Sequence, residues 1–296
     1  MRAIVIAAAL GAAVFVAGPE ARAFCLTHGC SDSRQDCVYD SRGCLMTGPV
    51  LHWASSCVSF DVQKDGSPKR GITYDMAHEA IVAGFSQWLG ARCGEGVGPG
   101  IRLNDYGPVE CRTPEYNEDG PNANVLMFRD EDWPYENAID TLALTTLIYD
   151  AKTGEIYDAD IEVNTFQSNM VTSGVGPSDI DFNSVITHEL GHFLGLSHSD
   201  AQGSTMHRSY APGQTAMASI ELDDEQGICE ALPPLREVKS ASCEPRHGFS
   251  EQCAVPETCG FAVPRRTTTG ASALLALLTL SWVARRKRSR PSTPRP

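Results

Sequence analysis

The sequence predicts an α+β domain in which short strands and one helix precede a histidine-bearing helix and a smaller C-terminal part. Three observations lead to this expectation. Residues 57–62 alternate apolar and polar side chains, as a half-buried strand does. Residues 73–89 place their apolar side chains along one stripe of a helix, with Thr73 or Asp75 as its cap. Three histidines at helix-compatible spacing follow within residues 188–198.

The chain begins with a segment that has the features of a secretory signal peptide. A basic residue stands near its start, residues 4–17 are apolar, and Ala21-Arg22-Ala23 forms a small-x-small cleavage site. A membrane anchor is the alternative, but the apolar run is short and a Gly-Pro pair ends it. We therefore expect residues 1–23 to be removed by cleavage after Ala23.

All eleven cysteines lie beyond that cut, which agrees with export to an oxidising compartment. Residues 24–47 form a segment with little apolar periodicity, which we interpret as a small disulfide-linked extension of undetermined pairing. A zinc knuckle is the alternative, although the paired C-x-x-C spacing is missing. Cys93 and Cys111 flank a Gly/Pro-rich loop and are expected to close it. The cysteines of the extension are Cys25, Cys30, Cys37 and Cys44.

The main domain is expected to span residues 48–232. Apolar runs alternate with short turns, and residues 150–154 (DAKTG) turn one run back onto the next. Ser178 or Asp181 can cap the histidine-bearing helix. Further strands are expected over residues 101–106, 124–128, 142–149 and 155–164, and a closing helix over residues 219–231.

The spacing of three histidines predicts a metal site. His188 and His192 are four residues apart, so on a helix they share one face and can bind one ion. Gly195 allows a sharp turn through positive φ, which would bring His198 round as a third ligand. Glu189 can then hold a water rather than the metal. Three nitrogens with one open position are the coordination of a catalytic zinc, whereas a single histidine is more often a surface or satisfied residue.

The motif resembles the zinc-binding signature of the metzincins, and Met206 lies where these proteins place the methionine of their Met-turn. Ser199 after the third histidine, the interval to Met206, and Tyr210 beyond it resemble the matrixins, the matrix-metalloproteinase family. Residues 154–161 are similar to a strand of bacterial matrixins, and residues 222–228 to the closing helix of the family. The resemblance implies the metzincin zincin fold, with a twisted mixed sheet, an active-site helix, the Met-turn and a small C-terminal subdomain.

Carried over position by position, the resemblance implies a zinc metalloendopeptidase with one catalytic Zn²⁺. Glu189 would be the general base. Met206 would lie beneath the metal site without contacting the ion, and ordinary core packing is its alternative role. Zinc lowers the pKa of its bound water to about 7, and the glutamate takes a proton as that water attacks a peptide carbonyl. The implied zinc ligands are His188, His192 and His198. The implied substrate-binding residues, beside which an extended protein or peptide pairs by its main chain, are Leu142, Ala143, Leu144, Thr145 and Tyr210.

The chain departs from the matrixin pattern at three places. Residues 207–208 follow the methionine as His-Arg where matrixins usually have Tyr-Pro, so the pocket wall can differ. No histidine lies between His78 and His188, and we therefore expect no second, structural zinc. Residues 92–94 (RCG) mimic part of the thiol segment that keeps family members latent, but they lie inside the domain, where a disulfide is the better interpretation.

Acidic residues near the 150–154 turn form a second candidate metal site. Their carboxylate oxygens suit Ca²⁺, which prefers oxygen ligands. Solvated loop carboxylates are the alternative interpretation. The candidates are Asp150, Asp158, Asp160 and Glu162.

The C-terminal end is expected to direct the protein to the cell surface. Residues 233–270 form a linker that contains proline and cysteine, and residues 271–296 combine an apolar run with a basic tail. This end resembles bacterial C-terminal sorting tails, nearest to the myxobacterial kind, and a sorting protease would act near Cys259. A simple membrane anchor is the alternative, although a stable span needs about 20 apolar residues. Either way we expect an exported protein that contacts the membrane through this segment and resides at the envelope surface or outside the cell.

Together these predictions describe a secreted or surface-sorted zinc endopeptidase. The net charge of −13 argues against nucleic acid as a partner. Two alternatives stay open: a zinc-binding surface or adhesion module without turnover, and a hydrolase of a different amide, for example in the cell wall. The presence of Glu189 favours hydrolysis over mere binding.

Overall fold

The computed structural model describes residues 22–30, 37–135 and 141–252. Its centre is a five-stranded sheet with the strand order β3-β2-β4-β6-β5. The first four of these strands pair in parallel, whereas β5 runs antiparallel to β6 and forms one edge. The strands are β2 (Cys57–Gln63), β3 (Arg102–Val109), β4 (Val125–Phe128), β5 (Ala143–Tyr149) and β6 (Ile156–Val163). The predicted α+β architecture with a mixed sheet is confirmed.

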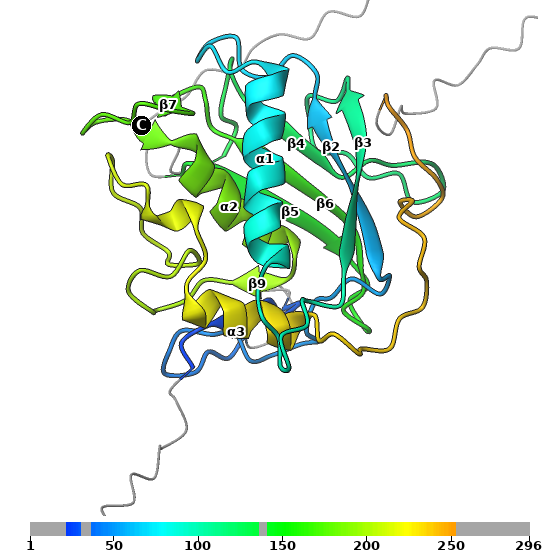
Figure 1. Ribbon diagram of the computed structural model, residues 1–296. Coiled ribbons are helices and arrows are strands. Elements are labelled where there is room, and N and C mark those ends of the chain that lie inside the picture. Colours follow the sequence, from blue (N-terminus) through cyan, green and yellow to red (C-terminus); the bar gives the residue numbers. More distant parts are fainter. Residues whose placement is uncertain (1–21, 31–36, 136–140, 253–296) are drawn as a thin grey trace, which may run out of the picture. The chain divides into compact units, whose positions relative to one another are not determined.

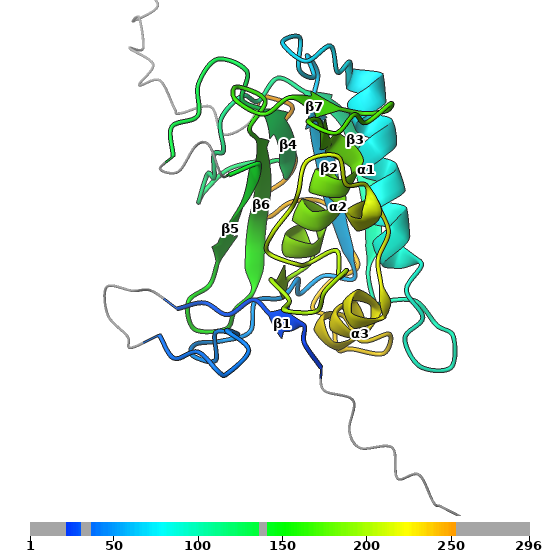
Figure 2. The same cartoon turned by 90° about the vertical axis from the view of Figure 1, so that its left-hand side faces the viewer.

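Two helices cover one face of the sheet. α1 (Tyr74–Leu89) and α2 (Phe182–Phe193) lie side by side there, as Figures 1 and 2 show from two directions. The Thr73 hydroxyl caps α1 by accepting a hydrogen bond from the Met76 amide at 3.2 Å. Trp88 is fully buried between the helices, and its Nε1 donates to the Thr187 carbonyl oxygen at 2.8 Å. This bond fixes α2, which carries two of the histidines, against the core.

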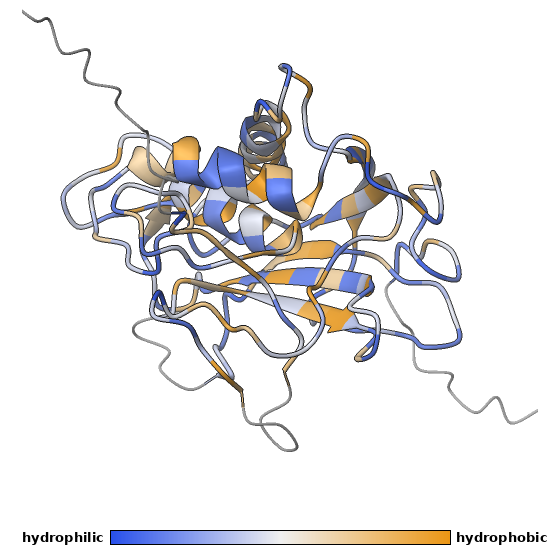
Figure 3. Cartoon of the chain, turned by 90° about the horizontal axis from the view of Figure 1, so that it is seen from below, coloured by the Kyte–Doolittle hydropathy of each residue, from blue (hydrophilic) through white to orange (hydrophobic). Residues whose placement is uncertain are grey.

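Both faces of the inner strand β2 are buried. Val58, Phe60 and Val62 join the core beneath the helices. Because side chains alternate along a strand, Ser59 and Asp61 lie on the opposite face, and both are fully buried as well. Figure 3 shows bands of hydrophobic and hydrophilic residues along the strands of the sheet.

An outer layer, formed by residues 110–124 and 236–252, covers that opposite face (Figure 1). A disulfide joins Cys57 to Cys243, and Phe249 packs against the apolar cluster on this face. The Arg236 guanidinium adds hydrogen bonds to three backbone carbonyl oxygens. Residues beyond 232, where the sequence predicts the end of the main domain, thus still contact the sheet. The domain boundary at residue 232 stays a prediction.

The N-terminal extension pairs with the segment that leads to the third histidine. β1 (Cys25–Leu26) is antiparallel to β9 (Leu196–Ser197), which directly precedes His198. The extension contains disulfides, as predicted, and its thiols are therefore not zinc ligands. The pairs that the sequence left open are Cys25–Cys44 and Cys30–Cys37.

The prediction that Cys93 and Cys111 bond to each other is wrong. Cys93 is bonded to Cys229 of α3 (Leu222–Ala231), with their Cα atoms 5.1 Å apart. A tight turn after α1, closed by a bridge between Cys93 and Val97, places this cysteine beside α3. Cys111 lies instead within the outer layer, where it is also disulfide-bonded. The segment that mimics a latency thiol thus holds no free thiol.

The remaining elements are short: β7 (Met170–Val171), β8 (Ile180–Asp181) and the 3₁₀ turn η1 (Ala216–Ala218). No helix among the described residues is long and apolar enough to cross a membrane. Residues 1–21 of the predicted signal peptide, the apolar run within residues 271–296, and Cys259 lie outside the described residues.

Candidate metal centre

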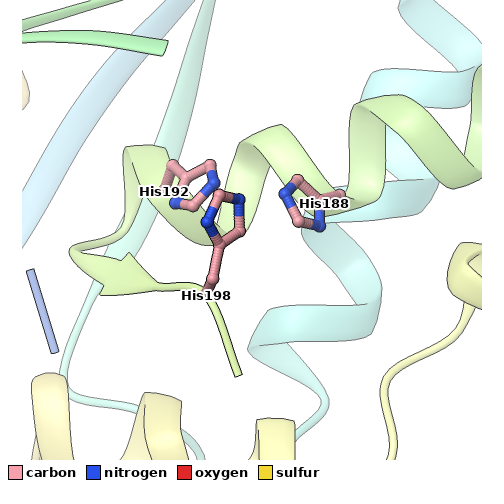
Figure 4. A group of neighbouring side chains, drawn as sticks. All are labelled: His188, His192 and His198. Atoms are coloured by element: carbon pink, nitrogen blue, oxygen red, sulfur yellow. The ribbon is translucent and has the colours of Figure 1, made fainter. Parts of the chain in front are cut away.

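The local sequence gives α2 a defined start and a sharp end. Asp181, one of the two predicted caps, accepts hydrogen bonds from the Ser184 amide at 3.0 Å and from the Ser184 hydroxyl at 2.7 Å. Beyond the helix the chain turns at Gly195, whose φ of +102° is a conformation that side chains rarely adopt. The turn leads into β9 and presents His198 opposite α2 (Figure 4).

The structure brings the three predicted histidines together. One nitrogen from each of His188, His192 and His198 lies within 4.8 Å of the other two. The ring centroids are 4.8 to 5.3 Å apart, and Figure 4 shows the rings gathered around a common point. In the described part of the chain, this is the one group of three His, Cys, Asp or Glu side chains that could hold a metal ion.

Backbone carbonyls determine which nitrogens of these rings are available. His188 Nδ1 lies 2.7 Å from the Thr205 carbonyl oxygen, and His192 Nδ1 lies 2.8 Å from that of Leu196. A carbonyl oxygen only accepts hydrogen bonds, so each Nδ1 carries the proton and each Nε2 keeps a lone pair. Burial lowers the pKa of His188 to about 4, and burial together with the His188 ring also lowers the pKa of His192. Both rings are therefore neutral at pH 7, the form that binds metals.

Glu189 lies beside the histidines as a buried carboxyl group. Its side chain is 6% exposed, and its Oε2 accepts a hydrogen bond from the Thr145 hydroxyl of β5 at 2.6 Å. Burial raises the pKa of Glu189, while the neighbouring His192 and the bond from Thr145 oppose the rise. A buried carboxyl group with a raised pKa next to a metal site is suited to proton transfer.

Met206 packs directly beneath α2. A Cβ atom added at Gly191 would lie 2.2 Å from the methionine sulfur, so the absence of a side chain at Gly191 permits this contact. Met206 is 1% exposed, and its carbonyl oxygen accepts from the Ser199 amide at 2.8 Å. The structure thus places Met206 under the histidines, where the sequence predicts a Met-turn.

Asp224 holds this turn in place, a role that no pattern in the sequence indicates. Its buried carboxylate accepts from the Ser204 hydroxyl at 2.5 Å and from the amides of Thr205 and Met206 at 2.7 and 3.1 Å. It also accepts from the Glu221 amide at 2.9 Å and so caps α3. The signal for such a residue is an acidic side chain in the first turn of a helix, but its partners are distant in sequence.

The neighbouring Asp223 connects the third histidine with the N-terminal extension. One of its carboxylate oxygens accepts from the Ser199 hydroxyl at 2.6 Å, and the other from the Phe24 amide at 3.1 Å. Ser199 follows His198 directly. The loop that bears the third histidine is therefore fixed from two sides, by β1 and by α3.

An Asp224→Ala variant is expected to lose on the order of 3 kcal/mol of unfolding free energy, because several buried donors would lose their acceptor at once. Urea unfolding of the two proteins measures this loss. Glu225→Ala, in the same turn of α3, is the control and should unfold as the wild type does. Equal stability of the Asp224→Ala variant and the wild type would show that water replaces the carboxylate at no cost.

A cleft runs beside the histidines. Its cavity measures about 630 Å³, and its walls include the predicted substrate-binding residues Leu142, Ala143 and Tyr210. Thr145 contacts Glu189, as described above, and Leu144 lies on the other face of β5 because side chains alternate along a strand. His207 and Arg208, the departures from the matrixin pattern, also line the cavity, and Arg208 pairs with Asp200 at 2.8 Å.

The structure does not gather the predicted calcium ligands into one group. Asp158, Asp160 and Glu162 are buried on the outer face of β6, so the alternative of solvated loop carboxylates is wrong for these three residues. Asp160 accepts from the amides of Glu115 and Val125 at 3.1 and 2.9 Å, and Glu162 lies 3.3 Å from the Arg129 guanidinium. Asp150 accepts amide hydrogen bonds within its own turn. Calcium binding stays a prediction.

Asp61, on the same outer face, makes stability depend on pH. Burial raises its pKa to about 8, and the nearby carboxylates Asp105 and Asp160 add to the rise. The folded protein therefore keeps a proton that the unfolded chain releases near pH 4, so this stabilisation is complete below pH 4 and is lost as pH rises to 8. The decline is at most about 1.4 kcal/mol per pH unit.

We expect an Asp61→Asn variant to show a flatter stability profile than the wild type between pH 5 and 8. Urea unfolding at several pH values measures both profiles, and the gap between them should widen as pH rises. The exposed Asp119, replaced in the same way, should leave the wild-type profile unchanged. Parallel profiles for Asp61→Asn and the wild type would mean that Asp61 is already ionised in the folded protein.

Comparison with known proteins agrees with this site. The matrixin family profile matches residues 114–231. The chain is 38% identical over 55 residues to metalloendoproteinase 1-MMP of Arabidopsis thaliana, a stretch covering 19% of this chain and 15% of that protein. It is 43% identical over 51 residues to matrilysin of Rattus norvegicus, covering 17% of this chain and 19% of that protein. The matches thus span less than a fifth of either relative, and with the family match they support a matrixin-like metzincin, in general terms a zinc metalloendopeptidase.

Proposed function

We propose that the protein is a secreted or surface-sorted zinc endopeptidase that hydrolyses peptide bonds of extracellular proteins. The observation that carries this proposal is the buried Glu189 beside three convergent imidazoles at the wall of an open cleft. The similarity of residues 114–231 to matrixins supports the same reaction. The disulfides suit an oxidising compartment and so support export.

The donor set fits a catalytic zinc. His188, His192 and His198 would hold the ion, and three imidazoles leave one coordination position open. Zinc bound there supplies Lewis acidity toward water and the peptide carbonyl. The bonds from Nδ1 of His188 and His192 to backbone carbonyls keep these rings oriented, as outer hydrogen bonds commonly do for metal ligands.

Glu189 would carry the protons in this reaction. Its carboxylate accepts a proton from the attacking water and later donates one to the leaving amine. Its burial beside the histidines keeps bulk water from competing for that proton. Met206 takes no proton and acts by supporting α2 from below.

β5 would bind the substrate backbone. It is an edge strand, so the backbone groups on its open side can pair with an extended peptide. The adjoining cavity of about 630 Å³ would receive one substrate side chain, with Tyr210 in its wall. Tyr210 is itself fixed, because its hydroxyl accepts from the Asp181 amide at 2.9 Å.

The proposed order along the chain is a signal peptide over residues 1–23, the extension over 24–47, the catalytic domain over 48–232, the linker over 233–270 and the sorting or anchoring tail over 271–296. N-terminal sequencing of the exported protein tests the first boundary and should begin at Phe24. To test whether a sorting protease acts on the tail, cells that express the wild type or a Cys259→Ala variant are separated into membrane and soluble fractions. The amount of the protein in the membrane fraction is then compared between the two.

Digestion of an unfolded protein by the purified full chain tests the proposed activity. We expect cleavage that stops when a zinc chelator is added and is absent from a Glu189→Ala variant. Persistent cleavage by that variant would contradict the proposed role of Glu189. Zinc binding without cleavage would favour an adhesion module, and release of cell-wall fragments without protein cleavage would favour an amide hydrolase of another kind.

A further inference from the structure

We propose that Thr145 is a positioning residue, whose hydroxyl holds the Glu189 carboxylate in the orientation that proton transfer requires. The proposal rests on the proposed function, because it assigns a task to Glu189 in peptide hydrolysis. It goes beyond a role in substrate pairing, which the sequence predicts for the β5 backbone. Thr145 would act through Glu189 and not on the substrate itself.

The contact between the two side chains is short and specific. Thr145 Oγ1 lies 2.6 Å from Glu189 Oε2 and 3.3 Å from the Glu189 carbonyl oxygen. A threonine hydroxyl has one hydrogen to donate, and the shorter distance assigns it to the carboxylate. Charge-assisted bonds of this kind are about twice as strong as bonds between neutral groups.

The hydroxyl is held by a rigid part of the fold. Thr145 pairs with Ile161 of β6, within a strand pair whose register is continuous from Ala143 to Ile148. A β-branched side chain has few rotamers to exchange, so a fixed backbone also fixes the hydroxyl. β5 also contacts α2, so the fold brings this edge of the sheet and the helix together.

Among the residues that the structure describes, Glu189 has no second anchor of this kind. Within the residues that the structure describes, Thr145 is the one side chain that donates a hydrogen bond to its carboxylate. A glutamate side chain rotates about three bonds, and holding it in one rotamer opposes its conformational entropy. With Oε2 bound to Thr145, Oε1 is the oxygen left for the water that the reaction consumes. A reacting group aligned in advance lowers the barrier in this way.

The position of Thr145 also connects substrate binding with catalysis. The strand that supplies this hydroxyl is the strand whose open edge would pair with the substrate backbone. A peptide added to that edge stiffens β5 and with it the bond to Glu189. Loss of the hydroxyl should therefore lower kcat and leave KM nearly unchanged, because the pairing backbone is intact.

Three variants of the full-length protein test the proposal. Thr145→Val keeps the shape and the branching of the side chain and removes the hydroxyl, and we expect kcat to fall about 10- to 100-fold. Thr145→Ser keeps the hydroxyl and should restore kcat to within about threefold of the wild type. Thr146→Val is the matched control, since Thr146 pairs with Asp160 and faces away from Glu189, and it should behave as the wild type.

A second readout is independent of turnover. Crystal structures of the wild type and of Thr145→Val should show the Glu189 carboxylate in different positions, with unchanged zinc content. An unchanged kcat for Thr145→Val, an effect on KM alone, or a serine variant as slow as the valine variant would each overturn the proposal. Equal cleavage by wild type and Glu189→Ala would instead overturn the proposed function, so the two failures are distinguishable.

Discussion

A Glu189→Gln variant is expected to lose about 1,000-fold in kcat while it still binds zinc. Glutamine has nearly the shape of glutamate, so the hydrogen bond from Thr145 and the packing of α2 can persist. The amide oxygen, however, does not take a proton from water at neutral pH. Because all three histidines remain, the metal site should stay intact.

Initial rates on a quenched fluorescent peptide and zinc analysis by atomic absorption measure the two halves of this prediction. Glu118→Gln, an exposed glutamate of the outer layer, is the control and should change neither value. A Glu189→Gln protein as active as the wild type would assign the proton transfer to another group. Loss of zinc together with activity would instead make Glu189 part of the metal site.

A His192→Ala variant is expected to lose both zinc and all measurable hydrolysis. Removal of a direct ligand should weaken zinc binding by more than the roughly 100-fold that follows loss of an outer hydrogen-bond partner. Without the His192 ring, only the imidazoles of His188 and His198 remain to bind the ion. Competition for zinc with a chromophoric chelator gives the affinity directly.

His207→Ala is the matched control for this experiment. His207 also lines the cleft but lies outside the histidine group, and its Nδ1 lies 3.2 Å from the Ser209 carbonyl oxygen. We expect this variant to keep its zinc and most of its activity. Full zinc binding by His192→Ala would refute the proposed ligand set, whatever the activity.

The parts of the fold that depend on local pattern could be predicted from the sequence. The expected helix over residues 73–89 corresponds to α1 (Tyr74–Leu89), and the expected strand over residues 142–149 corresponds to β5 (Ala143–Tyr149). The periodicity of a helix or strand is a property of consecutive residues, so it can be recognised without knowledge of tertiary contacts. The grouping of the three histidines follows from local geometry in the same way, because one helix and one turn carry all of them.

The parts that depend on distant partners could not be predicted. Cys93 has a nearer candidate in Cys111, yet its partner is Cys229, at a sequence separation of 136 residues. Asp224 looks like an ordinary helix cap until the turn that bears Met206 lies against it. Thr145 was predicted to bind substrate because it lies on an edge strand, and only the packing of β5 on α2 gives its hydroxyl another partner. In each case the decisive neighbour is brought close by the fold.

The double fixation of the loop that bears His198 has a consequence for the timing of activity. This loop is held by β1 at the start of the described chain and by Asp223 near the end of the domain. During synthesis β1 and α2 leave the ribosome before α3 exists, so the His198 loop of the growing chain has β1 but still lacks its contact with Asp223. If the proposed function holds, we expect hydrolysis to begin only once α3 has folded onto the His198 loop.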